Sequence, residues 1–291
     1  MDSTFARLCP FTVRKSLYYA SLTALVASLF VSTFFSFKIK EQNHYIDDLI
    51  NVAVHQKGLQ NTEEMVISLS KEIYRRTKRG LSKHDLDWYS QIESASFFNM
   101  TSAVSLKYGG YGIIDHPAFG PCGTMSRTLL NALWRLDIPA RKLQLLNNAQ
   151  SKGGGHTMIE FYHNGRWKVL SPSDNAFAWR NKDGEMATAR EIKDDYQVFS
   201  QIYKVKPHYR YLFDNPQNVR WDKLPSSIVR IIRFLIGEER FNTTQTPTLY
   251  DQPRELLFFT FSLSSIFFGV MGYILKPRNT ARAGNRSSKR T

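Results

Sequence analysis

Residues 120–141 read GPCGTMSRTLLNALWRLDIPAR, a pattern of loop, helix and strand with a cysteine where the helix begins. Apolar residues at helical spacing follow Cys122 as far as Leu136, and Ile138-Pro139 ends the run. The first turn of a helix has unpaired N–H groups and a partial positive charge, which favour a thiolate over a thiol. Burial for packing alone is the common alternative for a free cysteine. The pattern makes Cys122 a candidate nucleophile.

Two long apolar segments, 17–37 and 256–275, lie on either side of this stretch. Each lacks charged residues and has the length of about 20 residues that a helix needs to cross a bilayer. The first segment exceeds the 7–15 residues of a signal-peptide core, and no small-x-small cleavage site follows it. We therefore expect two transmembrane helices rather than a cleaved leader or two buried core helices.

The net charge of +14 is concentrated at the two ends of the chain. Residues 1–16 and 276–291 hold nine Lys/Arg and a single acid, Asp2. Positive flanks stay in the cytoplasm, so both termini are expected there and residues 38–255 outside it. The basic tail at 276–291 then contacts anionic lipid rather than nucleic acid. We expect an integral membrane protein of the bacterial inner membrane with an extracytoplasmic main domain.

The region between the spans divides into a helical first part and a mixed later part. Helical patterns are predicted at 41–55, from a capping box at Asn61 and Glu64 to Gly80, and from Ser82 toward Phe98. Loops are predicted at 109–112, 117–121 and 147–155, and strands at 141–146, 157–162 and 167–170. The last two strands are joined around Asn164-Gly165, a strong hairpin signal. The apolar run 228–236 is expected to be a core helix, with a helix lying on the membrane as the alternative.

A thiol nucleophile needs a base within hydrogen-bond reach and a third group to orient that base. His156 is the best placed of the seven histidines, because it opens a strand directly after three glycines. His163 is expected in the hairpin turn, and His116 lies in an irregular loop. No calcium, zinc or phosphate-binding pattern is present, so neither a metal nor a cofactor is expected.

Residues from about 115 to 180 resemble the core of transglutaminase-like proteins, which belong to the papain-like cysteine fold. The resemblance rests on four landmarks in order: Gly120-Pro121-Cys122 at a helix start, Leu133–Arg135 with Ile138-Pro139-Ala140-Arg141, Gly155-His156-Thr157 opening a strand, and Trp167 with Pro172. Ser171 stands where the family pattern has an aspartate. Asp174, Asn175 or Ser171 itself remain as candidates to orient His156.

The resemblance implies an α+β fold in which a cysteine-bearing helix packs on an antiparallel sheet, at about 100–215, between the two transmembrane helices. It also implies a catalytic set of Cys122, His156 and Asp174 that performs acyl transfer or hydrolysis on protein or peptide amides. The Cys122 N–H would help to hold the oxyanion, with Tyr108 or Tyr111 as candidates for a second donor. A catalytically inactive module that binds a peptide or envelope polymer is the alternative. A structural two-span scaffold is a third possibility.

Overall fold

The structure of the protein, a computed structural model, describes residues 11–76, 78–81, 111–113, 121–145, 155–214, 216–219, 221, 225–238, 241 and 251–277. The chain divides into two compact units, Met1–Ile39 with Arg254–Thr291, and Lys40–Pro253. Helices combine with an antiparallel sheet, in agreement with the predicted α+β class. The short elements are η2 (His55–Lys57), β1 (Lys78–Leu81), β2 (Tyr111–Ile113), α6 (Ala189–Asp194), α7 (Tyr196–Ser200) and η4 (Gln201–Lys204).

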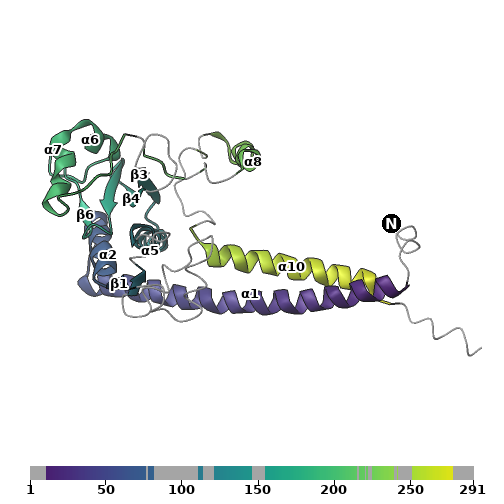
Figure 1. Ribbon diagram of the computed structural model, residues 1–291. Coiled ribbons are helices and arrows are strands. Elements are labelled where there is room, and N and C mark those ends of the chain that lie inside the picture. The colour runs from purple at the N-terminus through teal and green to yellow at the C-terminus, as the bar shows by residue number, and fades with distance from the viewer. Residues whose placement is uncertain are drawn as a thin grey trace, which may run out of the picture. The chain divides into compact units, whose positions relative to one another are not determined.

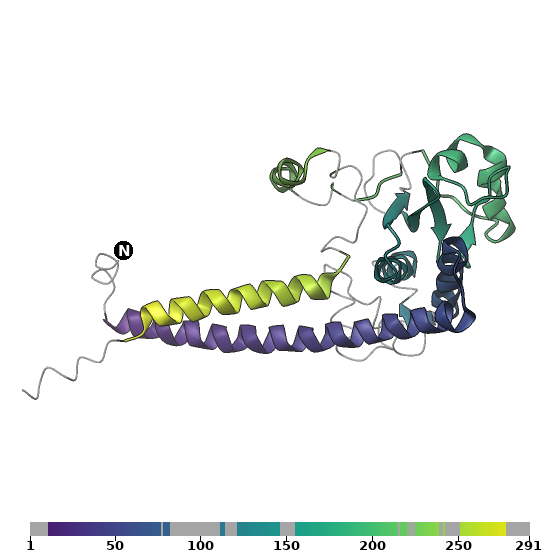
Figure 2. The same cartoon turned by 180° about the vertical axis from the view of Figure 1, so that it is seen from behind.

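The first unit is a helical hairpin. Helix α10 (Pro253–Leu275) runs beside the first part of α1 (Phe11–Ala53) in the opposite direction (Figures 1 and 2). Three contacts fix this direction: Arg14 Nε donates to Leu275 O at 3.3 Å, the hydroxyls of Ser32 and Ser262 lie 2.7 Å apart, and an Arg254 guanidinium nitrogen donates to Lys38 O at 3.4 Å. Small side chains at the contact allow two helices to approach closely, which is typical of membrane hairpins.

Both predicted transmembrane segments lie in this hairpin. Among the described residues, the helical stretches Val13–Lys57 and Arg254–Leu275 are long and apolar enough to cross a membrane. Many of their large apolar side chains are exposed, including Phe30 and Tyr273. The helix predicted separately at 41–55 is instead the continuation of α1, which runs to Ala53 without a break.

The second unit begins with helices that pack on a sheet. The Asn61 side chain accepts hydrogen bonds from the N–H groups of Glu63 and Glu64, as the capping pattern predicts, and α2 (Thr62–Arg76) follows. Helix α5 (Pro121–Arg135) is the helix expected after the Gly-Pro-Cys sequence. Its apolar face, with Leu129 and Leu133 fully buried, packs against α2 and the sheet.

The sheet has four antiparallel strands in the order β3 (Ala140–Leu145), β4 (His156–His163), β5 (Arg166–Ser171) and β6 (Phe177–Ala178) (Figure 1). The predicted hairpin joins β4 to β5 through Asn164 and Gly165, with φ of 51° and 75°. Two positive φ angles in succession are typical of a type I′ turn, whose twist matches that of the strands. This turn fixes which residues of β4 lie opposite those of β5.

Both faces of the sheet are buried. Residues that alternate along the strands, such as Ile159 and Leu170, join the core formed with α5, α2 and the end of α1. Their neighbours Met158 and Val169 point to the other face, where they join a core around Trp179 with α7 and η4. The sheet is therefore a layer between two apolar cores, and a polar group on β4 or β5 needs a partner.

Several expectations about the second unit are changed or lie outside the described residues. Tyr111–Ile113, expected partly as loop, forms β2 and pairs in parallel with β1, where the preceding helix was expected to continue to Gly80. Both differences have one cause, since the pairing joins Lys78 to Tyr111 and Leu81 to Ile113, which are too far apart in the sequence for local patterns to connect. The helix expected at 82–98 and the loops at 117–120 and 147–154 lie outside the described residues.

The expectation of a core helix at 228–236 is wrong. Helix α8 (Ser226–Ile236) forms as predicted, but none of its side chains is buried. Its periodicity gives an apolar face, and periodicity alone does not determine whether that face meets protein or lipid.

One buried ion pair ties α2 to the middle of the sheet. Lys168 on β5 is 1% exposed, and its ammonium group contacts the carboxylate of Glu63, which Arg180 also contacts at 3.2 Å. Burial raises the pKa of Glu63, but the hydrogen bond and charge of Lys168 outweigh it and hold that pKa below its usual value. The pair compensates a charge that would otherwise be stranded in the sheet.

We expect Glu63→Gln to destabilise the second unit by about 3 kcal/mol, because it leaves the Lys168 ammonium buried without its carboxylate. The measurement is thermal unfolding of the full-length protein in detergent. Glu64→Gln is the matched control, since Glu64 is exposed and the same change there should cost less than about 0.5 kcal/mol. Equal unfolding temperatures for the two variants would contradict the role of the pair.

Candidate active site

Cys122 is the second residue of α5, and its thiol is half-buried. One helical turn further on, Ser126 Oγ donates a hydrogen bond of 3.0 Å to Thr157 O, which ties the start of α5 to the start of β4. The sulfur also has hydrogen bonds to His156 and to the backbone of Thr157 and Gly123. The helix start therefore holds the thiol against the first residues of β4, as the sequence pattern predicts for a reactive cysteine.

His156 opens β4 opposite Leu145 and is 4% exposed. Its ring stacks on Tyr211 with centroids 4.8 Å apart and planes 16° apart, and it meets the edge of Tyr209 at 5.8 Å. Its Nε2 lies 2.7 Å from Asp174 Oδ2. Because Nε2 is engaged there, Nδ1 is the ring nitrogen left for the Cys122 thiol.

Asp174 reaches His156 from the turn that follows β5. Residues 172–175 form the turn, and Asn175 and Ala176 have φ of 57° and 53°. Two left-handed residues in succession reverse the chain sharply, which leaves the Asp174 carboxylate buried while Asn175 is exposed. Of the three candidates to orient His156, the structure thus brings Asp174 to the ring and leaves Asn175 in solvent.

Ser171 lies between His156 and Asp174. Its Oγ donates a hydrogen bond of 2.7 Å to Asp174 Oδ2 and lies 3.1 Å from His156 Nε2. The register that places Ile159 opposite Leu170 brings Ser171 to the same face of the sheet as His156. Ser171 therefore donates to a carboxylate that lies three residues later in the chain.

The segment after η4 contributes groups that the sequence did not indicate. Lys206 Nζ donates to Asp174 Oδ1 at 2.8 Å and lies 5.8 Å from the centroid of Tyr209. Tyr209 and Tyr211 enclose the imidazole. Local sequence patterns do not predict a role for these residues, because their position depends on how residues 201–211 fold back onto the sheet.

The charges in the site favour a thiolate beside an imidazolium. Burial raises the pKa of the Cys122 thiol, but the hydrogen bond and charge of His156 outweigh it, so the pKa lies below its ordinary value. Burial lowers the pKa of His156, and the hydrogen bonds to Asp174 and Cys122 outweigh burial and raise it to about 9. Burial also opposes ionisation of Asp174, yet His156 and Lys206 hold its pKa well below the usual range.

Other predicted contacts lie outside this geometry. His116 and Tyr108 are not among the described residues, and of Tyr111 only the backbone strand is described. Among the described residues, no group of three or more His, Cys, Asp or Glu side chains is arranged to hold a metal ion. The absence of a cofactor stays a prediction.

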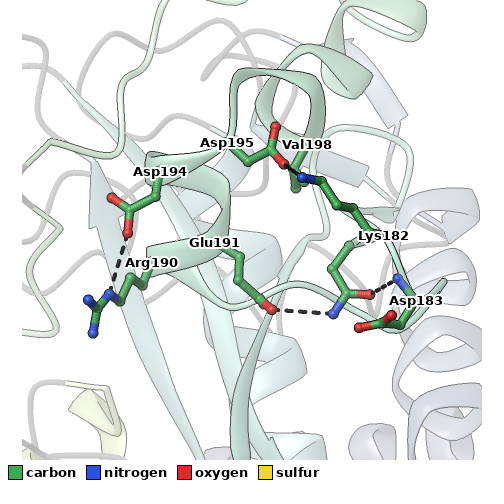
Figure 3. A pocket seen from close by; sticks show the side chains of 8 residues that line it. Lys182, Asp183, Arg190, Glu191, Asp194, Asp195 and Val198 are labelled. Atoms are coloured by element: carbon green, nitrogen blue, oxygen red, sulfur yellow. Dashed lines mark hydrogen bonds and ion pairs between the residues drawn. The ribbon is translucent and has the colours of Figure 1, made fainter.

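A recess of about 320 Å³ lies apart from these residues, on the surface around α6 and the start of α7 (Figure 3). Several of its polar side chains pair with one another: Lys182 with Asp195 at 3.4 Å, Arg190 with Asp194 at 3.4 Å, and the Asn181 amide with Glu191 at 3.3 Å. Because these side chains bind one another rather than converge on the recess, we interpret it as a solvated surface.

Comparison with known proteins gives limited similarity. No family model and no curated protein matches the chain. One similar solved structure is a TGase, with a TM-score of 0.32 and 19% sequence identity, and the match covers 57% of this chain and 38% of that chain. Another is Rad4–Rad23 bound to a 6-4 photoproduct UV lesion, with a TM-score of 0.32 and 13% identity, and the match covers 88% of this chain and 61% of that chain. The chain thus spans less than two thirds of either, and these TM-scores do not establish a family.

We expect iodoacetamide to alkylate Cys122 at pH values below the ordinary thiol pKa of about 8.5. The thiolate forms as the pH rises through a pKa that His156 lowers, so reaction should begin earlier in the wild type than in His156→Ala. The measurement is the alkylation rate of the full-length protein against pH, in a Cys9→Ser background that leaves Cys122 as the sole thiol.

Two further variants separate the partners of His156. Asp174→Ala should move the alkylation midpoint upward more than Ser171→Ala, because the carboxylate carries the charge that stabilises the imidazolium. If Ser171→Ala abolishes the early reactivity while Asp174→Ala leaves it unchanged, the assignment of Asp174 is wrong. A wild-type midpoint at about 8.5 that His156→Ala does not move would contradict the ion pair itself.

Proposed function

We propose that the chain is a membrane-anchored thiol enzyme that performs acyl transfer or hydrolysis on protein or peptide amides. The observation that carries the proposal is the buried His156 ring, which is hydrogen-bonded to the Cys122 thiol and to Asp174. A nucleophile, a base within hydrogen-bond reach of it and a carboxylate that orients the base form the arrangement that activates a thiol for covalent acyl transfer.

The reaction follows from the charges of the three groups. The Cys122 thiolate attacks the amide carbonyl carbon, and the N–H groups of the first turn of α5 are available to stabilise the oxyanion. Protonated His156 donates its proton to the leaving amine as the C–N bond breaks, which leaves a thioester on Cys122. Neutral His156 then takes a proton from an attacking amine or water, and the thiolate returns.

Asp174 keeps the imidazole in one orientation and stabilises its charged form during these steps. Ser171 and Lys206 occupy the remaining acceptor positions of the carboxylate and hold it in place. The two tyrosines limit access of water to the ring, which strengthens the electrostatic interactions around it.

We also propose that the core is of the transglutaminase-like, papain-like type. The order supports this: a cysteine at the start of α5, a histidine opening β4 and an acid just after β5, on a helix packed against an antiparallel sheet. The alternative is an inactive module that binds a peptide or envelope polymer, and the serine at position 171 is the feature in its favour. Ser171 is weak support for an inactive module, because His156 still has a carboxylate partner in Asp174.

We expect p-nitrophenyl acetate to acylate Cys122 in a burst equal to the enzyme concentration. Cys122→Ser should abolish the burst, and His156→Ala should slow it by about 10²- to 10⁴-fold because the base is lost. The measurement is p-nitrophenolate absorbance in a stopped flow, with Cys9→Ser as the control that keeps the burst. Faster turnover with added methylamine would indicate transfer rather than hydrolysis.

The inactive-module alternative predicts a different result. A folded wild-type protein whose Cys122 alkylates at low pH but gives no burst would favour the binding module over the enzyme.

The proposed location is the inner membrane of a bacterium, with residues 38–255 outside the cytoplasm. An antiparallel hairpin puts the two chain ends on one side of a bilayer, and the basic charge at both ends favours the cytoplasmic side. The substrate would then be an extracytoplasmic protein or peptide.

We expect a membrane-impermeant maleimide to label Tyr196→Cys in intact spheroplasts, in a Cys122→Ser background. Tyr196 lies in the second unit and is exposed, so its replacement should be accessible without permeabilisation. Cys9 should react only after the membrane is opened, which makes it the internal control. Labelling of Cys9 alone in intact spheroplasts would reverse the proposed topology.

A further inference from the structure

Helix α8 exposes most of its large apolar side chains. Phe234 is 87% exposed and Leu235 is 72% exposed, and Ile228, Ile231 and Ile236 are exposed as well. Elsewhere among the described residues, exposed apolar side chains gather at this density only in α1 and α10, the two candidate spans. An exposed apolar surface of this kind in a folded domain indicates an interaction site.

Both arginines of α8 and Ser226 lie along one narrow strip. At 100° per residue, Ser226, Arg230 and Arg233 fall within about 60°, or about one sixth of the helix circumference. Ser227 lies about 60° further round, and the apolar residues cover the broad opposite side. Arginines bordering a broad apolar face are typical of helices that lie in the headgroup region of an anionic bilayer. The Arg230 guanidinium can pair bidentately with lipid phosphate, whereas the Arg233 guanidinium already contacts the Glu238 carboxylate at 3.3 Å.

The length of α8 excludes a transmembrane role. Eleven residues extend about 16 Å at 1.5 Å per residue, whereas the hydrocarbon core is about 30 Å thick. The same length argues against a stable dimer formed by this face alone. Such an interface needs about 800 Å² per partner, far more than one side of three helical turns supplies.

The ends of α8 are held by an aromatic contact. The Trp221 and Phe241 rings, which flank the helix in sequence, stack with centroids 4.3 Å apart, and Trp221 Nε1 donates to Phe241 O at 3.1 Å. The Arg233 guanidinium lies 4.6 Å from the centroid of Phe241. Trp221 and Phe241, on either side of α8 in the sequence, are therefore in contact, and tryptophan is common at a membrane interface.

We propose that the apolar face of α8 lies in the outer, extracytoplasmic leaflet of the bilayer that α1 and α10 cross, with Arg230 at the lipid phosphates. Residues 237–252 alone separate α8 from α10, so the chain must return to this bilayer directly after α8. The proposal rests on the two spans crossing a membrane. Since α8 belongs to the compact unit that carries Cys122, the contact restricts the site to substrates near the membrane surface.

The test uses the full-length protein reconstituted in vesicles of phosphatidylglycerol and phosphatidylcholine, with Cys9→Ser and Cys122→Ser. An NBD fluorophore is attached at Leu235→Cys on the apolar face, and at Ser226→Cys on the polar strip of the same helix as the matched control. We expect the label at 235 to be quenched by lipids with a nitroxide near the headgroup and protected from iodide. The label at 226 should show the opposite behaviour.

A second variant pair tests the charge. Arg230→Glu should reduce lipid quenching at position 235 several-fold in vesicles rich in phosphatidylglycerol, and Arg230→Lys should retain it. Iodide quenching at 235 equal to that at 226 would overturn the proposal, because the face would then be in water. A label at 235 protected from both quenchers would overturn it too, in favour of a protein partner or a second copy. Failure of the protein to float with the vesicles would contradict both the membrane-spanning role of α1 and α10 and the proposed position of α8 in the bilayer.

Discussion

The contact between His156 Nε2 and Asp174 Oδ2, at 2.7 Å, is the interaction on which the rest of the candidate site depends. Both groups are buried, and burial opposes the charged form of each. Each charge offsets the burial of the other, so removal of either side chain leaves its partner less well compensated. The orientation of the imidazole toward Cys122, and the raised pKa that keeps it protonated, both follow from this contact.

Asp174 serves more than one partner, and this limits how far it can stabilise the histidine. Oδ2 accepts from Ser171 and His156, while Oδ1 accepts from Lys206. A second cation on the carboxylate keeps Asp174 ionised but competes with the imidazolium for its charge. Lys206 is partly exposed, so solvent weakens its share, and the buried histidine retains the stronger interaction. The arrangement fixes the carboxylate in position beside the imidazole.

Sequence patterns predicted the structural elements that depend on interactions between residues close together in the chain. The apolar segments, the helix after Cys122, the cap at Asn61 and the turn at Asn164-Gly165 each depend on residues within a few positions. The parallel pairing of β1 with β2, the approach of Lys206 to Asp174 and the exposure of α8 depend on distant parts of the chain. Asp174 combines both kinds of cause. The sequence made it one of three candidates to orient His156, and the turn with positive φ at Asn175 and Ala176 determines that Asp174 is the residue that reaches the ring.

The register of β4 and β5 links the site to the stability of the sheet. The type I′ turn sets the register of β4 and β5. Two buried ion pairs are consistent with this register: Lys168 of β5 with Glu63, and Arg141 of β3 with Glu160 of β4. A shift by one residue would turn His156 and Ser171 to the opposite face and would strand Lys168 and Glu160 in apolar cores. Other registers of the two strands therefore cost free energy in several ways at once. The same buried charges that cost free energy in the native sheet thus make it specific, and that specificity holds the imidazole within reach of the Cys122 thiol.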